Sequence, residues 1–299
     1  MTSTGGSSSG WEQAVRRDVE VLAGQIGERN YRFPRKLAAA ADYVEARLAA
    51  SGLPTRRLEY RYDGMTFCNL EAVLPGQSRP DEIVIIGAHY DTALGTPGAN
   101  DNASGVATVL AIANATVARG SVPARTMRFL AFTNEERPYF WGAGMGSLVY
   151  ARACRARGEK VVAMLAPETM GYYTTAPHSQ RYPWPFHWFY PSVGNFLGFI
   201  GMLSAARLVR RCLSFFRAHA TLPCEGAALP AFVPRIVASD HSSFWRCGYP
   251  AVMITDTAEF RYPYYHHPED TPDKLAYAPF VSAVLGLANV AWRLAGGQT

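Results

Sequence analysis

The chain has 299 residues, 48% of them hydrophobic, which is enough to bury the core of one large domain. Its formal charge of +5 at pH 7 is compatible with nucleic-acid binding. The basic residues, however, are mostly arginine and are scattered along the chain, with short clusters such as 207–217. Because no stripe of basic and aromatic residues accompanies them, we expect no nucleic-acid partner.

The five cysteines show no C-x-x-C spacing, which argues against a thiolate zinc site or a redox pair. An odd number leaves at least one thiol unpaired within the chain. One disulfide that involves Cys212, Cys224 or Cys247 stays open from the sequence.

Residues 1–10 are rich in Ser, Gly and Thr and predict a flexible leader before a single domain over 11–299. They lack the basic and apolar regions of a signal peptide, which favours a cytoplasmic location; secretion stays open if the N-terminus is incomplete. Segment 186–206 is the one stretch that suggests a membrane span. Because polar residues, proline and glycine interrupt it, we expect a loop, a short strand and a helix start there, and no span.

The predicted elements alternate between helices and strands along most of the chain. Segments 56–62 and 65–74 alternate apolar and polar residues, and Asp63-Gly64 between them is a strong hairpin signal. Segment 83–88 is instead an uninterrupted apolar run, typical of a strand covered on both faces. In chain order, we expect helices at 11–26, 32–51, 104–119, 146–157, 204–219 and 279–295, and strands at 56–62, 65–74, 83–88, 127–132, 161–165 and 250–254.

This alternation predicts a three-layer α/β domain, in which helices cover both faces of a mixed, mostly parallel central sheet. Segment 171–200 is rich in Tyr, Trp, Phe and Pro and too irregular to belong to the sheet. We therefore expect an aromatic lid or insert over about 172–200. A Pro/Gly-rich connection that ends at Pro234 should follow the helix at 204–219.

Acidic and histidine side chains follow four of the predicted buried strands. They are His89, Asp91 and Asp101 after the strand at 83–88, Glu135 and Glu136 after 127–132, Glu168 after 161–165, and His266, His267 and Asp270 after 250–254. The carboxyl ends of parallel strands meet at one edge of a sheet, so we expect these groups to converge in one crevice.

Histidines with several carboxylates and no thiolate suit zinc or a similar ion with open positions. The surplus of carboxylates also suits a pair of ions, and Asp101 is the natural bridge because it lies centrally, at a helix start. Of the adjacent Glu135 and Glu136, one can ligate while the other takes a proton from water. Asp91 can accept the second imidazole N–H of His89 and so orient the ring.

Five motifs occur in a characteristic order: His89-x-Asp91, Asp101-Asn-x-Ser-Gly105, Glu135-Glu136, Glu168-x-x-Gly171 and Tyr265-His266-x-Pro-Glu-Asp270-Thr-x-Asp273. Together they cover about residues 30–295 and resemble the co-catalytic zinc exopeptidases of clan MH. That group includes bacterial leucyl aminopeptidases, glutamate carboxypeptidase II and, more distantly, glutaminyl cyclase. The resemblance implies the phosphorylase/hydrolase-like fold of zinc-dependent exopeptidases.

The resemblance also implies two zinc ions per chain. One ion would be held by His89, Asp101 and Glu168, and the other by Asp101, Glu136 and His266. Glu135 would be the general base. Asp91 would be the second catalytic residue and would orient the ring of His89. Glu168 departs from the pattern, because many relatives have aspartate there. His266, not His267, keeps the family's spacing to the Asp-Thr pair.

From this resemblance we expect an aminopeptidase that releases N-terminal, mainly apolar, residues from peptides. The aromatic loops 172–190 and 258–265 are expected to form an apolar pocket or lid beside the metals. The candidate pocket residues are Tyr172, Asp240, His241, Tyr262 and Tyr264. A catalytic-triad interpretation of 239–241 is disfavoured because the chain has no G-x-S-x-G elbow.

Three alternatives are weighed against the aminopeptidase. A carboxypeptidase acting on acidic peptides needs convergent arginines, and Arg181, Arg235 and Arg261 are the candidates. A glutaminyl-peptide cyclotransferase would hold a single zinc ion, whereas this chain keeps all five expected ligands. A non-catalytic binding protein with the same fold would be expected to have lost some of them.

Overall fold

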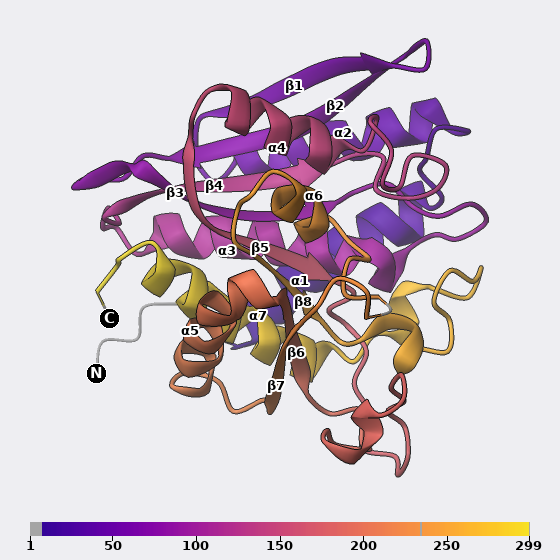
Figure 1. Ribbon diagram of the computed structural model, residues 1–299. Helices are drawn as coiled ribbons and strands as arrows, with labels where there is room; N and C mark the ends of the chain where they lie inside the picture. The colour runs from indigo at the N-terminus through magenta and orange to yellow at the C-terminus, as the bar shows by residue number, and fades with distance from the viewer. Residues whose placement is uncertain (1–7, 234, 299) are drawn as a thin grey trace.

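The computed structural model describes residues 8–233 and 235–298, which fold around one eight-stranded sheet (Figure 1). The strands are β1 (Thr55–Tyr62), β2 (Met65–Leu74), β3 (Arg79–His89), β4 (Arg125–Phe132), β5 (Lys160–Glu168), β6 (Leu197–Met202), β7 (Cys224–Leu229) and β8 (Ala251–Thr255). The helices are α1 (Ser8–Val19), α2 (Pro34–Ala49), α3 (Ser104–Ala118), α4 (Gly146–Ala156), α5 (Ala206–Arg217), α6 (His241–Arg246) and α7 (Tyr277–Leu294).

The strand order is β1-β2-β4-β3-β5-β8-β6-β7, and the four central strands β4, β3, β5 and β8 are parallel. Strands β1 and β2 pair antiparallel at one side, and β6 joins β8 antiparallel at the other. The central strands therefore end at one edge of the sheet, where the register sets His89 beside Phe132 and Glu168 beside Thr255. The expected mixed, mostly parallel α/β sheet is confirmed.

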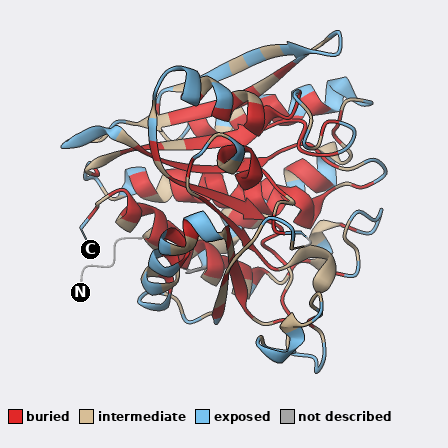
Figure 2. Ribbon diagram, in the orientation of Figure 1, coloured by how far each residue is buried: buried red, intermediate tan, exposed pale blue. Residues whose placement is uncertain are grey.

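Helices cover the sheet on both faces, and Figure 2 shows the central strands buried between them. Val84 and Ile86 pack into the larger core, which includes residues of α1, α2, α3, α5 and α7. Ile83 and Ile85 pack into the smaller core, which includes residues of α4 and α6. Successive residues of a strand point to opposite faces, so a run that is apolar without interruption must be buried on both.

The structure corrects the sequence-based prediction at the β6–β7 side of the sheet. Segment 171–200 is irregular only as far as residue 196, since β6 begins at Leu197 and pairs with β8 and β7. The Pro/Gly-rich connection contains β7, and the short helix α6 was also unexpected. The sequence of β7, Cys-Glu-Gly-Ala-Ala-Leu, has little β propensity, and pairing with β6 determines its conformation.

Helix α1 begins at Ser8, within the 1–10 segment expected as a leader; residues 1–7 lie outside the described part of the chain. All five cysteines, which are described, are free, so the disulfide left open by the sequence is absent. Within residues 8–233 and 235–298, no helix combines the length and apolar character needed to cross a bilayer.

Candidate metal centre and its cavity

Two overlapping groups of ligand-type side chains lie at the carboxyl edge of the sheet. His89, Asp101 and Glu168 form one group, and Asp101, Glu136 and His266 form the other; within each group the ligand atoms lie within 4.8 Å of one another. His89 and Glu168 are the last residues of β3 and β5. Glu136 lies in the loop after β4, Asp101 just before α3 and His266 in the loop after β8. The structure thus brings together the five residues that the sequence placed in these two groups.

Asp101 lies between the two groups. Its Oδ1 atom is 3.3 Å from Nε2 of His89, and its Oδ2 atom is 2.9 Å from Nε2 of His266. Both oxygens are buried and accept no hydrogen bond, and Nε2 of His89 is also buried without a hydrogen-bond partner. Buried polar atoms are rarely left without partners, so these three atoms fit a site that binds a cation. The donor set, two imidazoles and three carboxylates, fits zinc.

His89 is the last residue of β3, and a hydrogen bond at its Nδ1 atom fixes the orientation of its ring. Its Nδ1–H donates to the main-chain oxygen of Asp91 at 3.1 Å, while the Asp91 carboxylate lies farther away, with Oδ1 at 3.6 Å from Nδ1. The expected orienting contact therefore comes first from the backbone of Asp91 and not from its side chain. Either contact fixes the tautomer that leaves Nε2 free to ligate.

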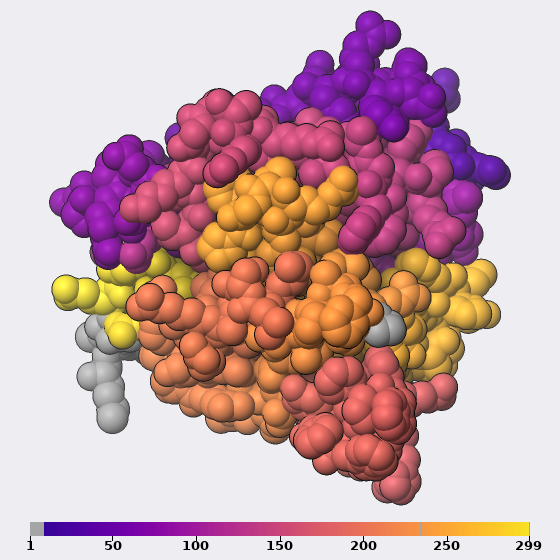
Figure 3. Space-filling model, in the orientation of Figure 1, coloured from indigo at the N-terminus to yellow at the C-terminus, as the bar shows by residue number. Residues whose placement is uncertain are grey.

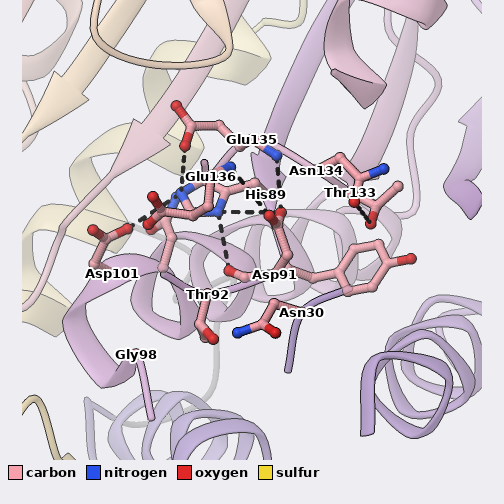
Figure 4. A network of polar contacts seen from close by, with 12 residues as sticks. Asn30, His89, Asp91, Thr92, Gly98, Asp101, Thr133, Asn134, Glu135 and Glu136 are labelled. Atoms are coloured by element: carbon pink, nitrogen blue, oxygen red, sulfur yellow. Dashed lines mark hydrogen bonds and ion pairs between the residues drawn. The ribbon is translucent and has the colours of Figure 1, made fainter. Parts of the chain in front are cut away.

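The Asp91 carboxylate instead anchors the residues after β4. Its Oδ1 and Oδ2 atoms accept the backbone N–H groups of Glu135 and Glu136, each at 3.1 Å (Figure 4). Asn134, just before them, has a positive φ of 58°, a conformation unfavourable for a residue with a side chain. The carboxylate thus holds a sharply turned segment, so that two adjacent glutamates face the site.

The segment around Asp101 is fixed by a second carboxylate. Asp270 accepts the backbone N–H groups of Asn100 at 2.8 Å and of Asp101 at 3.1 Å. The hydroxyl of Tyr262 donates to the same Asp270 side chain at 2.7 Å. Asp270 and Tyr262 therefore position Asp101 and belong to neither ligand group.

Glu168 is held by two neutral donors. The hydroxyl of Ser239 and the side-chain amide of Asn102 donate to its Oε2 atom, at 2.6 and 3.2 Å. Burial, more than the opposing effect of nearby His89, raises the pKa of Glu168 to about 7. The glutamate that replaces the usual aspartate still places this oxygen 3.3 Å from Nε2 of His89.

The electrostatics of the site are those of a cation-binding cluster. Burial lowers the pKa of His266, but the nearby carboxylates of Asp101 and Glu136, at 2.9 and 3.1 Å from its Nε2 atom, outweigh it and raise that pKa to about 11. Burial, together with the nearby Glu136 and Glu168 carboxylates, raises the pKa of Glu135 well above its ordinary value. The cluster therefore retains protons strongly, and a divalent cation competes for the same negative charge.

A cavity of about 120 Å³ adjoins the cluster and is bounded at that end by Glu168 and Tyr265. Its walls come from the 182–190 segment, β6, β7, β8, Val233, residues 235–238 and the turn 258–260. Phe186 lines the cavity, while Trp188 and Phe189 of the same segment are exposed. Figure 3 shows this aromatic segment as a knob at the lower right. The segment around Phe186, within the 172–200 range expected as a lid or insert, is thus a loop with one side against the cavity.

The five candidate pocket residues lie elsewhere. Tyr172 and Tyr262 pack against each other, with ring centroids 5.0 Å apart, and Tyr264 packs edge-on against Tyr262. Asp240 and His241, at the start of α6, are fully buried. None of the five is among the residues that line the cavity.

Tyr265 was not assigned a role from the sequence. Its ring stacks on that of His266, with centroids 4.0 Å apart and planes 18° apart. Burial raises the pKa of its hydroxyl, and the nearby carboxylates of Asp101 and Glu136 raise it further. A neutral phenol therefore lies where the cluster meets the cavity. Its position directly before His266 was the only signal in the sequence.

Arg29 is a second residue that the sequence analysis missed, because a lone arginine carries no signal. It is completely buried, and the hydrogen bonds that its guanidinium donates within the described residues all go to main-chain oxygens. Those acceptors are Tyr90 at 2.7 Å, Pro97 at 2.6 Å, Leu22 and Gly98 at 3.1 Å, and Gly27 at 3.2 Å. Arg29 therefore fixes the loop that connects His89 to Asp101.

The three arginines that a carboxypeptidase would need do not converge. Arg181 is exposed and does not line the cavity. Arg261 is buried and donates to Gln180 at 2.8 Å and to the main chain of Phe196 at 2.9 Å. Arg235 lines the cavity but is paired with Glu259. No free cluster of guanidinium groups forms among these three residues.

Comparison with known proteins agrees with this geometry. Residues 69–289 match the family described as peptidase family M28. An uncharacterised protein of Escherichia coli, YfbL, is 33% identical over 93% of this chain and 87% of its own length. A probable leucine aminopeptidase of Arthroderma otae is 26% identical over 82% of this chain, which spans only 61% of that protein.

Solved structures share the fold. The aminopeptidase LapA of Legionella pneumophila superposes with a TM-score of 0.74 at 17% identity, over 96% of this chain and 73% of that one. BSAP, a zinc aminopeptidase from Bacillus subtilis, gives 0.71 at 12% identity over 95% of both chains. Glutaminyl cyclase of Fimbriiglobus ruber gives 0.66 at 18% identity over 94% of both. The resemblance inferred from the motifs is confirmed: this chain belongs to peptidase family M28 and is a peptidase of the clan MH type.

Proposed function

We propose that this protein is a zinc aminopeptidase that binds two ions bridged by Asp101 and releases N-terminal residues with apolar side chains. One observation carries the proposal. The two oxygens of Asp101 are buried, accept no hydrogen bond and face two different histidines. A carboxylate in this arrangement suits a bridge between two cations, since each oxygen has one ligand set on its own side.

The residues that would hold the ions are His89, Asp101 and Glu168 on one side and Asp101, Glu136 and His266 on the other. Zinc, when bound there, supplies Lewis acidity, which polarises a carbonyl oxygen and makes water more acidic. The likeness to a zinc aminopeptidase and a relative named as a probable leucine aminopeptidase support this choice of metal and reaction.

Glu135 is the residue placed to move protons. Its Oε2 atom lies 3.9 Å from Nε2 of His89, so its carboxylate borders the cluster without completing either ligand group. A raised pKa suits a carboxylate that accepts a proton from the attacking water and returns it to the leaving amine. The hydroxyl of Tyr265 is available to donate a hydrogen bond to the negative charge that develops on the carbonyl oxygen.

The cavity supplies the preference for the first residue. Phe186, Ile200, Met253 and Phe260 are among its lining residues, so an apolar side chain is desolvated there on binding. An N-terminal substrate also matches the charge of the cluster, because a free α-amine is attracted by its carboxylates. The three arginines offer no comparable site for a substrate carboxylate.

The proposal is tested by assaying the zinc-loaded protein with leucyl, glutamyl and acetyl-leucyl p-nitroanilides, and with a peptide that begins with glutamine. We expect cleavage of the unblocked leucyl compound and none of the acetylated one. Glu135→Gln should lose turnover and keep its zinc, whereas Glu136→Gln should lose zinc. Cyclisation of the glutaminyl peptide without leucine release would contradict the proposal.

A further inference from the structure

One carboxylate in the cavity has no partner. Glu225 of β7 lines it, and within the described residues this side chain makes no hydrogen bond and no ion pair. The other charged lining groups are already engaged: Glu168 belongs to the metal cluster, and Arg235 is paired with Glu259. An otherwise apolar cavity thus contains a single unpaired negative charge away from the cluster.

The sheet register places this charge opposite the cluster. Glu168 pairs with Thr255, Thr255 with Gly198, and Gly198 with Glu225, so the four residues form one row across β5, β8, β6 and β7. Neighbouring strands lie about 4.8 Å apart, which sets the two glutamate Cα atoms about 14 Å apart. Residues paired in this way point to the same face, and all four line the cavity. Gly198 adds no side chain, so the space between Thr255 and Glu225 stays open.

The next row on the same face is apolar. Met253 pairs with Ile200, and Ile200 with Ala227, and these three residues also line the cavity. The cavity surface between the cluster and Glu225 is therefore aliphatic. Tyr190 and Tyr182 lie near its far end: burial raises the pKa of Tyr190, and the Glu225 carboxylate raises it further. A carboxylate beside aromatic rings is a favourable environment for an organic cation.

We propose that this cavity binds the side chain of an N-terminal lysine or arginine, with its aliphatic stem along Ile200 and Met253 and its cationic end at Glu225. The inference rests on the aminopeptidase proposed above and names a second class of first residue for the same site. Lysine and arginine combine an apolar stem with a terminal cation, which matches both parts of the cavity. Acidic first residues are excluded, because Glu225 and the cluster repel them.

The test compares lysine with norleucine, which has the same straight stem without the ammonium group. Lysyl and norleucyl p-nitroanilides are assayed with the wild type, with Glu225→Gln and with a control, Glu59→Gln. Glu59 is exposed on β1, the opposite edge strand, so its substitution leaves the cavity unchanged. Glu225→Gln should lower kcat/KM for the lysyl substrate about tenfold or more, as the loss of a charge-assisted contact predicts, and spare the norleucyl substrate.

Equal losses for both substrates, or no loss with the lysyl substrate, would overturn the inference. Binding of free L-lysine and L-norleucine to the zinc-loaded protein, measured by calorimetry, tests it without turnover. Lysine binding that depends on Glu225 in a protein that cleaves nothing would support the cavity assignment and refute the aminopeptidase. If the protein cleaves leucyl substrates and its lysine binding does not depend on Glu225, the aminopeptidase proposal is supported and the cavity assignment is refuted.

Discussion

The Oδ1 atom of Asp91 accepts the backbone N–H of Glu135 at 3.1 Å, which ties the loop after β3 to the loop after β4. The Oδ2 atom holds Glu136 in the same way. One carboxylate thus sets the position of both the proposed base and a proposed ligand. Two hydrogen bonds from main-chain N–H groups require an acceptor at each oxygen, and an amide side chain has only one.

Asp91→Asn should therefore lower activity while the fold is kept. The amide nitrogen would face a backbone N–H, and the 135–136 segment would move away from the cluster. Changes to residues that support metal ligands typically cost about 10- to 100-fold in activity or metal affinity. The measurement is kcat/KM together with zinc content. Full activity in this variant would show that the anchor is unnecessary.

Arg29 should stabilise the whole region between His89 and Asp101. Arg29→Met leaves buried main-chain oxygens without donors, at about 1–3 kcal/mol each, so we expect at least about 3 kcal/mol less stability. Zinc affinity should fall as well, because Tyr90 and Pro97 are acceptors within the loop that connects the two ligands. Urea unfolding and zinc titration measure the two effects. Arg61→Met, at an exposed arginine, is the control, and identical behaviour of the two variants would refute this role.

His241 should make stability depend on pH. Burial lowers its pKa from 6.5 to about 4, and its Nε2 contacts the main-chain oxygen of Ile236 at 2.8 Å. Between these two values the unfolded chain binds the proton and the folded protein does not. The contribution is therefore present above pH 6.5 and is lost as the pH falls towards 4, by roughly 3 kcal/mol for this shift.

The comparison for this prediction is between the wild type and His241→Phe, unfolded in urea at several pH values. The difference in unfolding free energy should change across pH 4–6.5 and level off above it, since phenylalanine does not titrate. Because both proteins carry the same metal cluster, the pH dependence of that cluster cancels in the difference. A difference that stays constant over this range would count against a neutral buried histidine.

Gly198 should set the depth of the cavity. A side chain at this position would fill the space between Thr255 and Glu225, and its Cβ would lie only 3.3 Å from the main-chain oxygen of Thr255. Gly198→Val should lower kcat/KM for leucyl and phenylalanyl substrates about tenfold or more relative to an alanyl substrate. A uniform loss for all three substrates would indicate a general disturbance instead of a shallower cavity.

The central strands and the proposed ligands could be predicted from the same sequence pattern, a run of apolar residues that ends at a polar one. Segments such as 83–88 are apolar on both faces, and polar groups such as His89 and Glu168 begin where the apolar run stops. Parallel pairing then brings those ends to one edge. The position of Asp101 between the two ligand groups was expected from its place just before α3.

The cavity could not be predicted in the same way. Its walls belong to β6 and β7, whose glycines and alanines give weak strand signals, and to the irregular 182–190 segment. The candidate residues Tyr172 and Tyr262 were selected by composition, yet the chain packs them against each other. The sequence does not place Glu225 near the site; only the strand register, which sets it in one row with Glu168, does so.

The central claim is that Asp101 bridges two zinc ions, and zinc counts by native mass spectrometry test it most directly. The wild type should bind two ions. Glu168→Gln and Glu136→Gln should each lose one ion and keep the other, and Asp101→Asn should weaken both. A wild type that saturates at one ion, or Glu168 and Glu136 variants that still bind two, would contradict the account.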